Sequence, residues 1–374
     1  MDKKIGNLII CTDLFTIAGG IQRFNKVFYQ AIRDIFPDRG QPTYILSLLD
    51  NPKHFLQTNL FVDQMDKVFG YHARKTLFLF DVVKLALRFR PKRIFFTHIN
   101  FAPLAILIRL FAPSSQVWIV LHGFEAWEKI NRLSTFGVQL CYGVLSVSRF
   151  TKEEFCKRNP ISPDIVHVIN LVSDHEWDSS PTIHNDLLAD FPYILCVARL
   201  ESEHAEYKGV DKTIEAFAAL AKSSRLKGFH LYIVGEGDDR SRLESLAEME
   251  GISQIVHFTG RVGDNELRSL YANCEMFVLP STKEGFGLVY LEAMVYGKPV
   301  IASQYGASKE IVLDGQTGFL VPPDGINYLI EKISYLINFK LEREKLGQAG
   351  KNRYNECFTY QKFLERLKQA LAPY

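Results

Sequence analysis

Residues 276–294 read MFVLPSTKEGFGLVYLEAM, and this stretch decides how the rest of the chain is interpreted. Four apolar residues bounded by Pro280 predict a short buried strand, which is typical of a parallel sheet. A glycine-rich loop follows, and the apolar residues between Leu288 and Tyr296 predict a helix. A strand, a loop and a helix in this order form half of a βαβ unit, so the stretch predicts an α/β fold.

The same alternation of short apolar runs and helical patterns continues outward to both ends of the chain. In the first half we expect strands at 7–11, 43–48, 94–98, 116–121, 144–147 and 165–169, with helices at 21–36, 77–89, 101–111 and 148–158. In the second half we expect strands at 193–197, 230–234, 255–258, 276–279 and 299–302, with helices at 210–223, 239–249, 264–271, 288–296 and 325–337. This pattern predicts two doubly wound parallel-sheet domains, which suits a length of 374 residues.

A polar, irregular segment from Asn170 to Pro192 is predicted to join the two domains. We place the domains at 1–185 and 186–355. The tail from Thr359 to Leu371 has an amphipathic pattern. Residues 356–374 are therefore expected to form a C-terminal helix that packs back on the N-terminal domain.

Composition limits the classes of function. The chain has 44 Lys and Arg residues against 42 Asp and Glu residues, and this balance argues against a general nucleic-acid binder. Its six cysteines form no CxxC pair, and several lie inside apolar runs, which fits a reducing cytoplasm without a zinc or redox motif. The longest apolar stretch, 101–112, is too short to span a membrane. We expect a cytoplasmic protein, with peripheral contact to the inner face of a membrane left open.

The loop after the strand at 276–279 is the most specific candidate site. Its amides, together with the start of the next helix, suit a phosphate, because unpaired N–H groups and the helix dipole attract anions. Glu284 on the loop and Glu292 on the helix can accept hydrogen bonds from paired hydroxyl groups, such as those of a sugar or a ribose. The competing interpretation is two solvated glutamates, which the intervening glycines and apolar residues disfavour.

Two cations lie upstream of this loop. Arg199 follows the predicted strand at 193–197, and Lys208 comes directly before Gly209 and the next helix. Ligands bind at the carboxyl edge of doubly wound parallel sheets. Arg199 can clamp a phosphate through two hydrogen bonds, and Lys208 can act as a point charge. Either residue alone is more often a surface residue, but both together with the glycine-rich loop predict a phosphate pocket.

Two further candidates lie in the N-terminal half. Gly19 and Gly20 open the helix after the first strand, where backbone amides can approach a ligand closely; the alternative is a plain connecting loop. His122 stands beside Gly123 after the strand at 116–121 and is predicted to contact a ligand, although a lone histidine is usually structural.

Other patterns carry less information. The loop 235–240 begins like a dinucleotide fingerprint but has Arg240 in place of the third glycine, so a turn is at least as good an interpretation. The basic cluster at 88–93 is interpreted as a solvated turn, with an anionic lipid or a carrier phosphate as the alternative partner. No DxD, HExxH or GxSxG pattern occurs, so neither a metal site nor a hydrolase nucleophile is predicted.

These motifs resemble those of the retaining GT-B glycosyltransferases of family 4. Residues 284–294, EGFGLVYLEAM, resemble the EX7E signature of that family, and residues 198–200 and 207–209 look like its basic diphosphate pair. In the N-terminal half, Gly19-Gly20, His122-Gly123 and Val147-Ser148 lie where the family has a glycine loop, a cleft histidine and a strand-end serine. The chain departs from the family in a longer stretch between the two cations and in Ala198, which replaces a glycine.

The resemblance implies two Rossmann-like domains, of which 1–185 binds the acceptor and 186–355 binds the nucleotide sugar. It implies hexosyl transfer from a UDP- or GDP-sugar to a hydroxyl acceptor, with retained configuration and without a metal ion or other cofactor. The acceptor would be a sugar or a lipid-linked glycan in polysaccharide or glycoconjugate biosynthesis, with no nucleic acid as partner. Peripheral membrane contact would run through the N-terminal domain.

The resemblance also implies a role for each matching residue. Arg199 and Lys208 would neutralise the leaving diphosphate, while Glu284 and His122 would contact the donor sugar as the remaining catalytic residues. Glu292 would bind the ribose. The other donor contacts would come from backbone groups of Gly19, Gly20, Phe286, Gly287 and Leu288.

Several alternatives remain open. A nucleotide-sugar epimerase or a non-catalytic sugar-nucleotide-binding protein would use the same fold and the same ligand. A glycosidase using Glu284 and Glu292 is disfavoured by Arg199 and Lys208, because it has no phosphate to neutralise. A dehydrogenase is disfavoured by the missing third glycine at Arg240.

Overall fold

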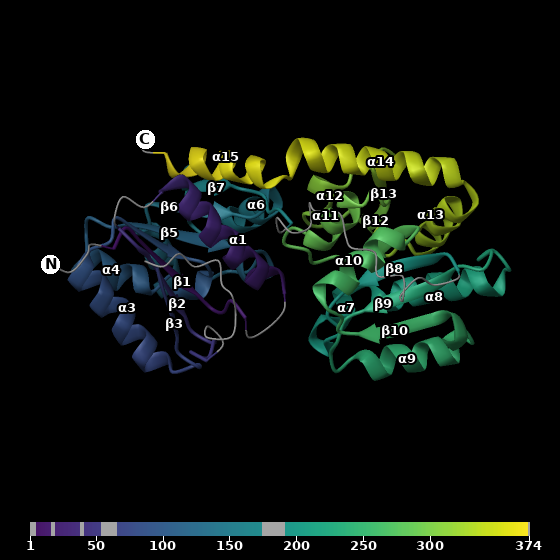
Figure 1. Cartoon of the computed structure of the whole chain (residues 1–374), viewed down its shortest axis with the longest axis horizontal. Coiled ribbons are helices and arrows are strands. Elements are labelled where there is room, and N and C mark those ends of the chain that lie inside the picture. Colours follow the sequence, from purple (N-terminus) through teal and green to yellow (C-terminus); the bar gives the residue numbers. More distant parts are fainter. Residues whose placement is uncertain (1–4, 16–18, 38–40, 54–65, 174–190, 373–374) are drawn as a thin grey trace. The chain divides into compact units, whose positions relative to one another are not determined.

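The computed structural model describes residues 5–15, 19–37, 41–53, 66–173 and 191–372. The chain divides into two compact units, whose elements are labelled in Figure 1. The first holds the residues up to Leu171 together with those from Phe363 onward, and the second holds Val172 to Lys362. The predicted boundary at 185/186 falls within 174–190, outside the described residues.

The first unit is built on a seven-stranded sheet in the order β3-β2-β1-β4-β5-β6-β7, and all its pairings are parallel. Its strands are β1 (Asn7–Cys11), β2 (Thr43–Ser47), β3 (Lys67–Gly70), β4 (Arg93–Phe96), β5 (Gln116–Leu121), β6 (Gly143–Ser146) and β7 (Val166–Val168). Its helices and 3-10 turns are α1 (Gly20–Ile35), α3 (Lys75–Phe89), η1 (Ile99–Phe101), α4 (Leu104–Phe111), η2 (Phe124–Ala126), α5 (Arg132–Gln139), α6 (Arg149–Arg158) and η3 (Pro163–Ile165). The doubly wound parallel sheet predicted for this half is confirmed.

One apolar core joins the sheet to α3, α4, α5 and α6, through Phe78, Ile108, Val138 and Phe155 among others. The helix predicted at 101–111 is divided, because Pro103 has no N–H group to continue a turn and stands instead directly before α4. The preceding residues form the short turn η1. Neither β3 nor α5 is among the predicted elements.

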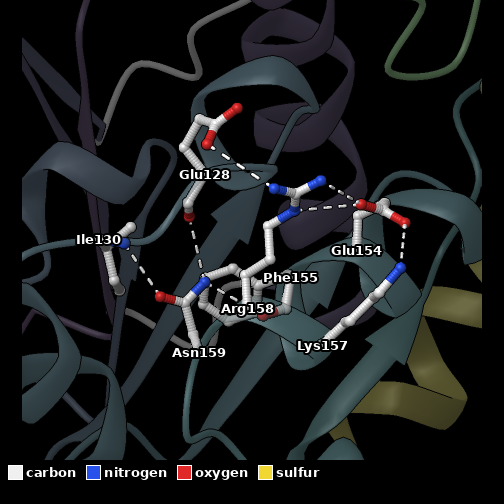
Figure 2. Close-up of polar contacts among 7 residues, drawn as sticks. All are labelled: Glu128, Ile130, Glu154, Phe155, Lys157, Arg158 and Asn159. Atoms are coloured by element: carbon white, nitrogen blue, oxygen red, sulfur yellow. Dashed lines mark hydrogen bonds and ion pairs between the residues drawn. The ribbon is translucent and has the colours of Figure 1, made fainter.

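The segment before α5 is fastened to the end of α6, as Figure 2 shows. The buried Asn159 amide accepts a hydrogen bond from the Ile130 N–H at 2.9 Å and donates to the carbonyls of Glu128 and Phe155. Arg158 adds ion pairs with Glu154 at 3.0 Å and with Glu128 at 3.8 Å. One side chain at the end of α6 therefore fixes where α5 starts.

The second unit has a six-stranded parallel sheet in the order β10-β9-β8-β11-β12-β13. Its strands are β8 (Tyr193–Val197), β9 (His230–Val234), β10 (Val256–Gly260), β11 (Met276–Leu279), β12 (Val300–Ser303) and β13 (Gly318–Val321). Its helices and 3-10 turns are η6 (Ser202–His204), α7 (Ala205–Lys208), α8 (Val210–Lys222), α9 (Arg240–Met249), η7 (Ser253–Ile255), α10 (Asp264–Asn273), α11 (Leu288–Val295), α12 (Ser308–Ile311), α13 (Ile326–Asn338) and α14 (Lys340–Cys357). The last helix, α15 (Tyr360–Leu371), runs from this unit into the residues grouped with the first.

The order of the strands creates a switch point in each sheet. In the second unit β9 lies on one side of β8 and β11 on the other, and in the first unit β2 and β4 flank β1 in the same way. Connections on the two sides of such a point leave in opposite directions, which opens a crevice at the carboxyl ends of the strands. The loops after β8 and β11 in the second unit, and those after β1 and β4 in the first, therefore lie at these switch points. The candidate His122 follows β5, the strand beyond β4.

Candidate active site

The loop between β11 and α11 ends in a backbone conformation that glycine adopts easily and other residues do not. Gly287 caps α11 with φ of 107°, and a Cβ atom there would lie 2.4 Å from the ring of Tyr290. That ring cannot move aside easily, because Tyr290 is buried and its hydroxyl donates to the Leu279 carbonyl at 2.9 Å. Phe286 packs its ring on Phe358, so it can offer a ligand only its backbone. The amides of 286–288 are thus held by a rigid turn.

Lys208, at the end of α7, forms an ion pair with Glu284 on this loop. The Lys208 Nζ atom lies 2.7 Å from Glu284 Oε1, and the two side chains are only 21% and 13% exposed. Gly209, with φ of 71°, brings the end of α7 against the Pro280 carbonyl, where a Cβ atom would come within 2.9 Å. The Thr282 N–H donates to the Tyr207 carbonyl at 2.8 Å. The two halves of the site, far apart in sequence, are therefore joined through backbone as well as charge.

Arg199 follows β8, the strand beside β11 in the sheet. Burial raises the pKa of Tyr207 to about 12, with the Glu284 carboxylate adding to the rise and Arg199 opposing it. The Lys208 Nζ atom lies 5.9 Å from the centre of the Tyr207 ring. Lys208 and Glu284 are thus close to this tyrosine, and Arg199 follows the neighbouring strand β8 at the switch point of the sheet. The interpretation of Glu284 and Glu292 as solvated surface residues is wrong, since Glu292 on α11 is only 2% exposed.

The loop 235–240 is a structural support for the segment that carries Arg199. A Cβ atom on Gly235 or Gly237 would lie within 2 Å of the carbonyl oxygen of Ala198 or Leu200. The Leu200 N–H donates to the Glu236 carbonyl at 2.9 Å, so the two segments continue the pairing of β8 with β9. These contacts favour the turn interpretation of this GxG pattern.

The N-terminal glycine loop is only partly described, because residues 16–18 lie outside the described part. Gly19 has an extended backbone and precedes α1, whose first residue is Gly20. The stretch before it is held by Asp50, which accepts hydrogen bonds from the Leu14 and Phe15 amides at 2.6 and 3.0 Å.

A second buried carboxylate stands in the same region. Asp13 accepts from the side-chain amide of Gln22 through both oxygens, at 2.8 and 2.7 Å, and its backbone carbonyl accepts from Asn25. Neither Asp13 nor Asp50 is among the candidate residues predicted from the sequence. The signal that points to both residues is an aspartate just beyond the end of a strand.

His122 follows β5 and has a defined tautomer. Its Nε2 atom lies 2.7 Å from the Thr97 carbonyl oxygen, which only accepts, so this nitrogen carries the proton. Burial lowers the pKa of His122 below its usual value, nearby Glu125 opposes this, and His98 adds to it. The ring is therefore neutral at neutral pH, and its Nδ1 atom is the nitrogen with a lone pair.

His98, just beyond β4, is a neighbour of His122 that is not among the candidates predicted from the sequence. Its ring centroid lies 6.3 Å from that of His122, and its Nδ1 atom accepts from the Asn100 N–H at 3.2 Å. Burial lowers the pKa of His98 as well. When neutral, His98 therefore carries its proton on Nε2.

The candidate residues fall into two groups, one in each unit. The second unit pairs Lys208 with Glu284 on the loop that contains the turn at 286–288, and it buries Glu292 on the adjoining helix. Arg199 follows β8, the strand next to the one that leads into this loop. The first unit holds Gly19, Gly20 and His122 at the carboxyl edge of its own sheet. Ser148 in this unit caps α6 by accepting from the Thr151 N–H at 3.0 Å, which gives it a structural role.

Among the residues that the structure describes, no group of three or more His, Cys, Asp or Glu side chains is arranged to hold a metal ion. No helix within the same residues combines the length and the apolar character that crossing a bilayer requires.

Comparison with known proteins identifies the class to which this fold corresponds. Residues 180–353 match the family model for glycosyl transferases group 1. The whole fold matches a crystal structure of Anabaena HepE in complex with UDP, with a TM-score of 0.79 and 19% identity over 98% of this chain and 99% of that one. It also matches a glycosyltransferase from Rickettsia africae, with a TM-score of 0.78 and 17% identity over 99% of this chain and all of the other. The two parallel-sheet domains match the fold of GT-B glycosyltransferase structures, which confirms the predicted fold class.

Curated relatives match over part of their length. An uncharacterized glycosyltransferase of Methanocaldococcus jannaschii is 36% identical over 41% of this chain and 42% of its own length. The MMP alpha-(1->4)-mannosyltransferase of Mycolicibacterium hassiacum is 30% identical over 58% of this chain and 51% of its own. A GDP-mannose-dependent alpha-(1-6)-phosphatidylinositol monomannoside mannosyltransferase of Mycolicibacterium smegmatis is 29% identical over 56% of each chain. The chain thus spans about half the length of these relatives.

Proposed function

We propose that this chain is a retaining, metal-independent glycosyltransferase of family 4 that moves a hexose from a nucleotide-diphosphate sugar to a hydroxyl acceptor. The observation that carries the proposal is the ion pair of Lys208 with Glu284 at the switch point of the second unit's sheet, where Arg199 also follows β8. Ligands of doubly wound folds bind at such points. Two cations beside a turn of held backbone amides suit a diphosphate, which a glycosidase does not bind.

The proposed reaction balances without a further reactant. The bond between the anomeric carbon and the diphosphate oxygen breaks, and the acceptor's hydroxyl oxygen bonds to that carbon from the same face. The hydroxyl proton passes to an oxygen of the leaving phosphate. Arg199 and Lys208 stabilise the negative charge that grows on the diphosphate, which is the task that a metal ion has in other transferases.

The ion pair of Lys208 with Glu284 supports this arrangement. A lysine on a flexible four-carbon stem must lose rotamer freedom before it can act on a phosphate. The contact with Glu284 holds the ammonium group in place before the donor arrives, so less reorganisation remains in the reaction. Glu284 keeps a second oxygen for a hydroxyl of the donor sugar.

The remaining roles are proposed from the resemblance, and burial and hydrogen bonding support those of Glu292 and His122. The buried carboxylate of Glu292 is proposed to bind the ribose hydroxyls, and the amides of 286–288 to bind the sugar and phosphate. In the first unit, Gly19, Gly20 and His122 are proposed to contact the donor sugar. The neutral His122 ring would accept a hydrogen bond from a sugar hydroxyl through Nδ1.

The names of similar proteins support candidates for the donor and acceptor. The Mycolicibacterium smegmatis relative is by its name dependent on GDP-mannose and acts on a phosphatidylinositol mannoside, and the HepE structure holds UDP. We propose a GDP- or UDP-hexose as donor and a sugar or lipid-linked glycan as acceptor, in glycoconjugate or polysaccharide synthesis at the cytoplasmic face of a membrane.

A thermal-shift screen in excess EDTA tests the donor class. GDP-mannose, UDP-glucose and ADP-glucose are compared with the free sugars and with NAD. One nucleotide sugar is expected to stabilise the chain by about 2.7 kcal/mol at a hundred times its dissociation constant, because it binds only the native state. Stabilisation by NAD alone would contradict the proposal, and stabilisation that needs added magnesium or manganese would contradict its metal-free part.

The nucleotide sugar found in this way also distinguishes a transferase from the two alternatives on this fold, an epimerase and a non-catalytic binding protein. An epimerase would convert the nucleotide sugar to its epimer without any acceptor, which NMR of the mixture detects. A binding protein would leave the donor intact, whereas a transferase is expected to release nucleoside diphosphate, slowly with water and faster with an acceptor.

A further inference from the structure

Large apolar side chains gather on one surface of the first unit. Of the fourteen that are exposed among the described residues, nine lie on α3, α4 and α5: Leu77, Leu79, Phe80, Leu87, Leu107, Leu110, Phe111, Leu133 and Phe136. Helices α3 and α4 lie side by side in Figure 1, and α4 also contacts α5. Exposed apolar residues scattered singly need no explanation, but a contiguous set marks an interaction surface.

The spacing along α3 places these side chains on one stripe. Leu77, Phe80, Lys84, Leu87 and Arg88 are exposed and recur at helical intervals, opposite the face that buries Phe78, Val82 and Ala86 in the core. Apolar residues on both faces are unusual for a helix that meets water on one side. On α4 the exposed Leu107, Leu110 and Phe111 also share one face.

The charges on these three helices have one sign. They carry five basic residues, Lys75, Lys84, Arg88, Arg109 and Arg132, all exposed, and a single acidic residue, Asp81. Asp81 faces inward to accept a hydrogen bond from the Tyr71 hydroxyl at 3.0 Å. The Lys84 Nζ atom lies 5.7 Å from the centre of the Phe80 ring, so charge and apolar surface alternate at close range. We call the exposed residues of α3, α4 and α5 the α3–α5 face.

The basic cluster at 88–93 extends this face. Arg88, Arg90 and Lys92 are exposed at the end of α3. Arg93 does not belong to this exposed group, because its guanidinium packs on the Phe36 ring, 3.4 Å from the ring centre. Burial there lowers the pKa of Arg93. The three exposed cations therefore continue the positive charge of the α3–α5 face beyond the end of α3.

We propose that the α3–α5 face docks on an anionic lipid bilayer. Apolar side chains rimmed by lysine and arginine suit the boundary between headgroups and acyl chains, where the apolar part is buried and the cations reach the phosphates. A bilayer fits better than a second copy of the chain, because pairing this face with itself would bring like charges together. Docking does not depend on the proposed glycosyl transfer, so each can fail alone.

Vesicle flotation of the intact chain tests the proposal. It is expected to bind vesicles in which about a third of the lipid is phosphatidylglycerol, to bind pure phosphatidylcholine weakly, and to lose binding as salt screens the charges. Two variant pairs, Phe80→Ser with Leu110→Ser and Lys84→Glu with Arg88→Glu, are each expected to lower the partition coefficient at least tenfold. All four side chains are exposed, so folding should survive.

Matched controls lie in the second unit. Met249→Ser with Leu341→Ser removes apolar side chains that are 77% and 80% exposed, and Lys340→Glu with Lys345→Glu reverses two exposed charges. Both control pairs are expected to bind vesicles like the unchanged chain. The proposal is overturned if the unchanged chain does not bind anionic vesicles, or if the α3–α5 variants bind as the controls do. The proposal is also overturned if the unchanged chain binds no vesicles but forms a dimer in analytical ultracentrifugation, and if only the α3–α5 variants dissociate that dimer. The face would then be assigned to a second copy of the chain.

Discussion

Lys208→Ala is expected to lower the turnover number about a hundredfold or more at saturating donor. The ammonium group lies 2.7 Å from Glu284 and is proposed to stabilise the charge that grows on the leaving diphosphate. An interaction that strengthens in the transition state acts on the chemical step, whereas uniform binding changes only the Michaelis constant. Removing one such donor typically costs two to three orders of magnitude, ~100–1,000-fold. Release of nucleoside diphosphate from the donor measures the effect.

Three comparison variants make this result specific. Lys222→Ala breaks a solvent-accessible ion pair of similar length, 2.6 Å, between Lys222 on α8 and Glu250 just after α9, and is expected to leave turnover unchanged. Glu292→Ala is expected mainly to weaken donor binding, because a ribose contact is remote from the breaking bond. Lys208→Arg keeps the charge and should recover part of the loss. If Lys208→Ala raises only the Michaelis constant, Lys208 has no catalytic role.

Gly287→Ala is expected to destabilise the second unit by about 3–5 kcal/mol and to abolish donor binding. A methyl group there meets the Tyr290 ring at 2.4 Å and forces a left-handed backbone on an alanine. Relief requires the turn at 286–288 to move, and with it the amides proposed to hold the phosphate. Chemical denaturation and a donor titration measure the two effects.

Gly251→Ala is the matched control for backbone strain. Gly251 has a similar left-handed φ of 75° but open space where the methyl group would go. This variant is expected to cost only about 1–2 kcal/mol and to leave donor binding intact. Equal destabilisation by the two variants would show that the contact with Tyr290 is unimportant for the turn.

The pattern of buried strands made most of this fold predictable. The strands Asn7–Cys11, Gln116–Leu121, Tyr193–Val197, His230–Val234 and Met276–Leu279 begin and end where they are predicted. Each is a short apolar run, because a parallel strand is covered on both faces.

Helix α14 shows where local pattern stops being informative. It is rich in charge and contains Gly347 and Gly350, which argue against a helix on propensity. The structure gives the reason for one of them: a Cβ atom on Gly347 would lie 1.9 Å from the Gly297 carbonyl oxygen, so only glycine lets the helix approach the turn after α11. The requirement arises from tertiary packing between distant segments, which a single sequence does not display.

The candidate site, too, could be predicted only in part from the sequence. Glu284 and the glycine turn could be predicted, because they lie in one stretch with a fixed spacing. The ion pair with Lys208 joins residues 76 positions apart and depends on α7 being tied to the loop after β11. Asp13, Asp50 and His98 stand alone in the sequence, and only the fold brings them to the edge of one sheet. Their polar side chains at strand ends are the sole local signal.

Calorimetric titration with a nucleoside diphosphate and its parent nucleoside tests the central claim most directly, since it needs neither sugar nor acceptor. The ligands are GDP with guanosine and UDP with uridine. Each is titrated into the unchanged chain and into the double variant Arg199→Ala with Lys208→Ala. Because each charge-assisted hydrogen bond contributes about 1.5–3 kcal/mol, the unchanged chain should bind the diphosphate at least about a hundredfold tighter than the nucleoside. The double variant should bind the two within about tenfold of each other, with its nucleoside affinity unchanged. A double variant that binds the diphosphate as tightly as the unchanged chain would contradict the assignment of Arg199 and Lys208 to the diphosphate, and with it the proposed site.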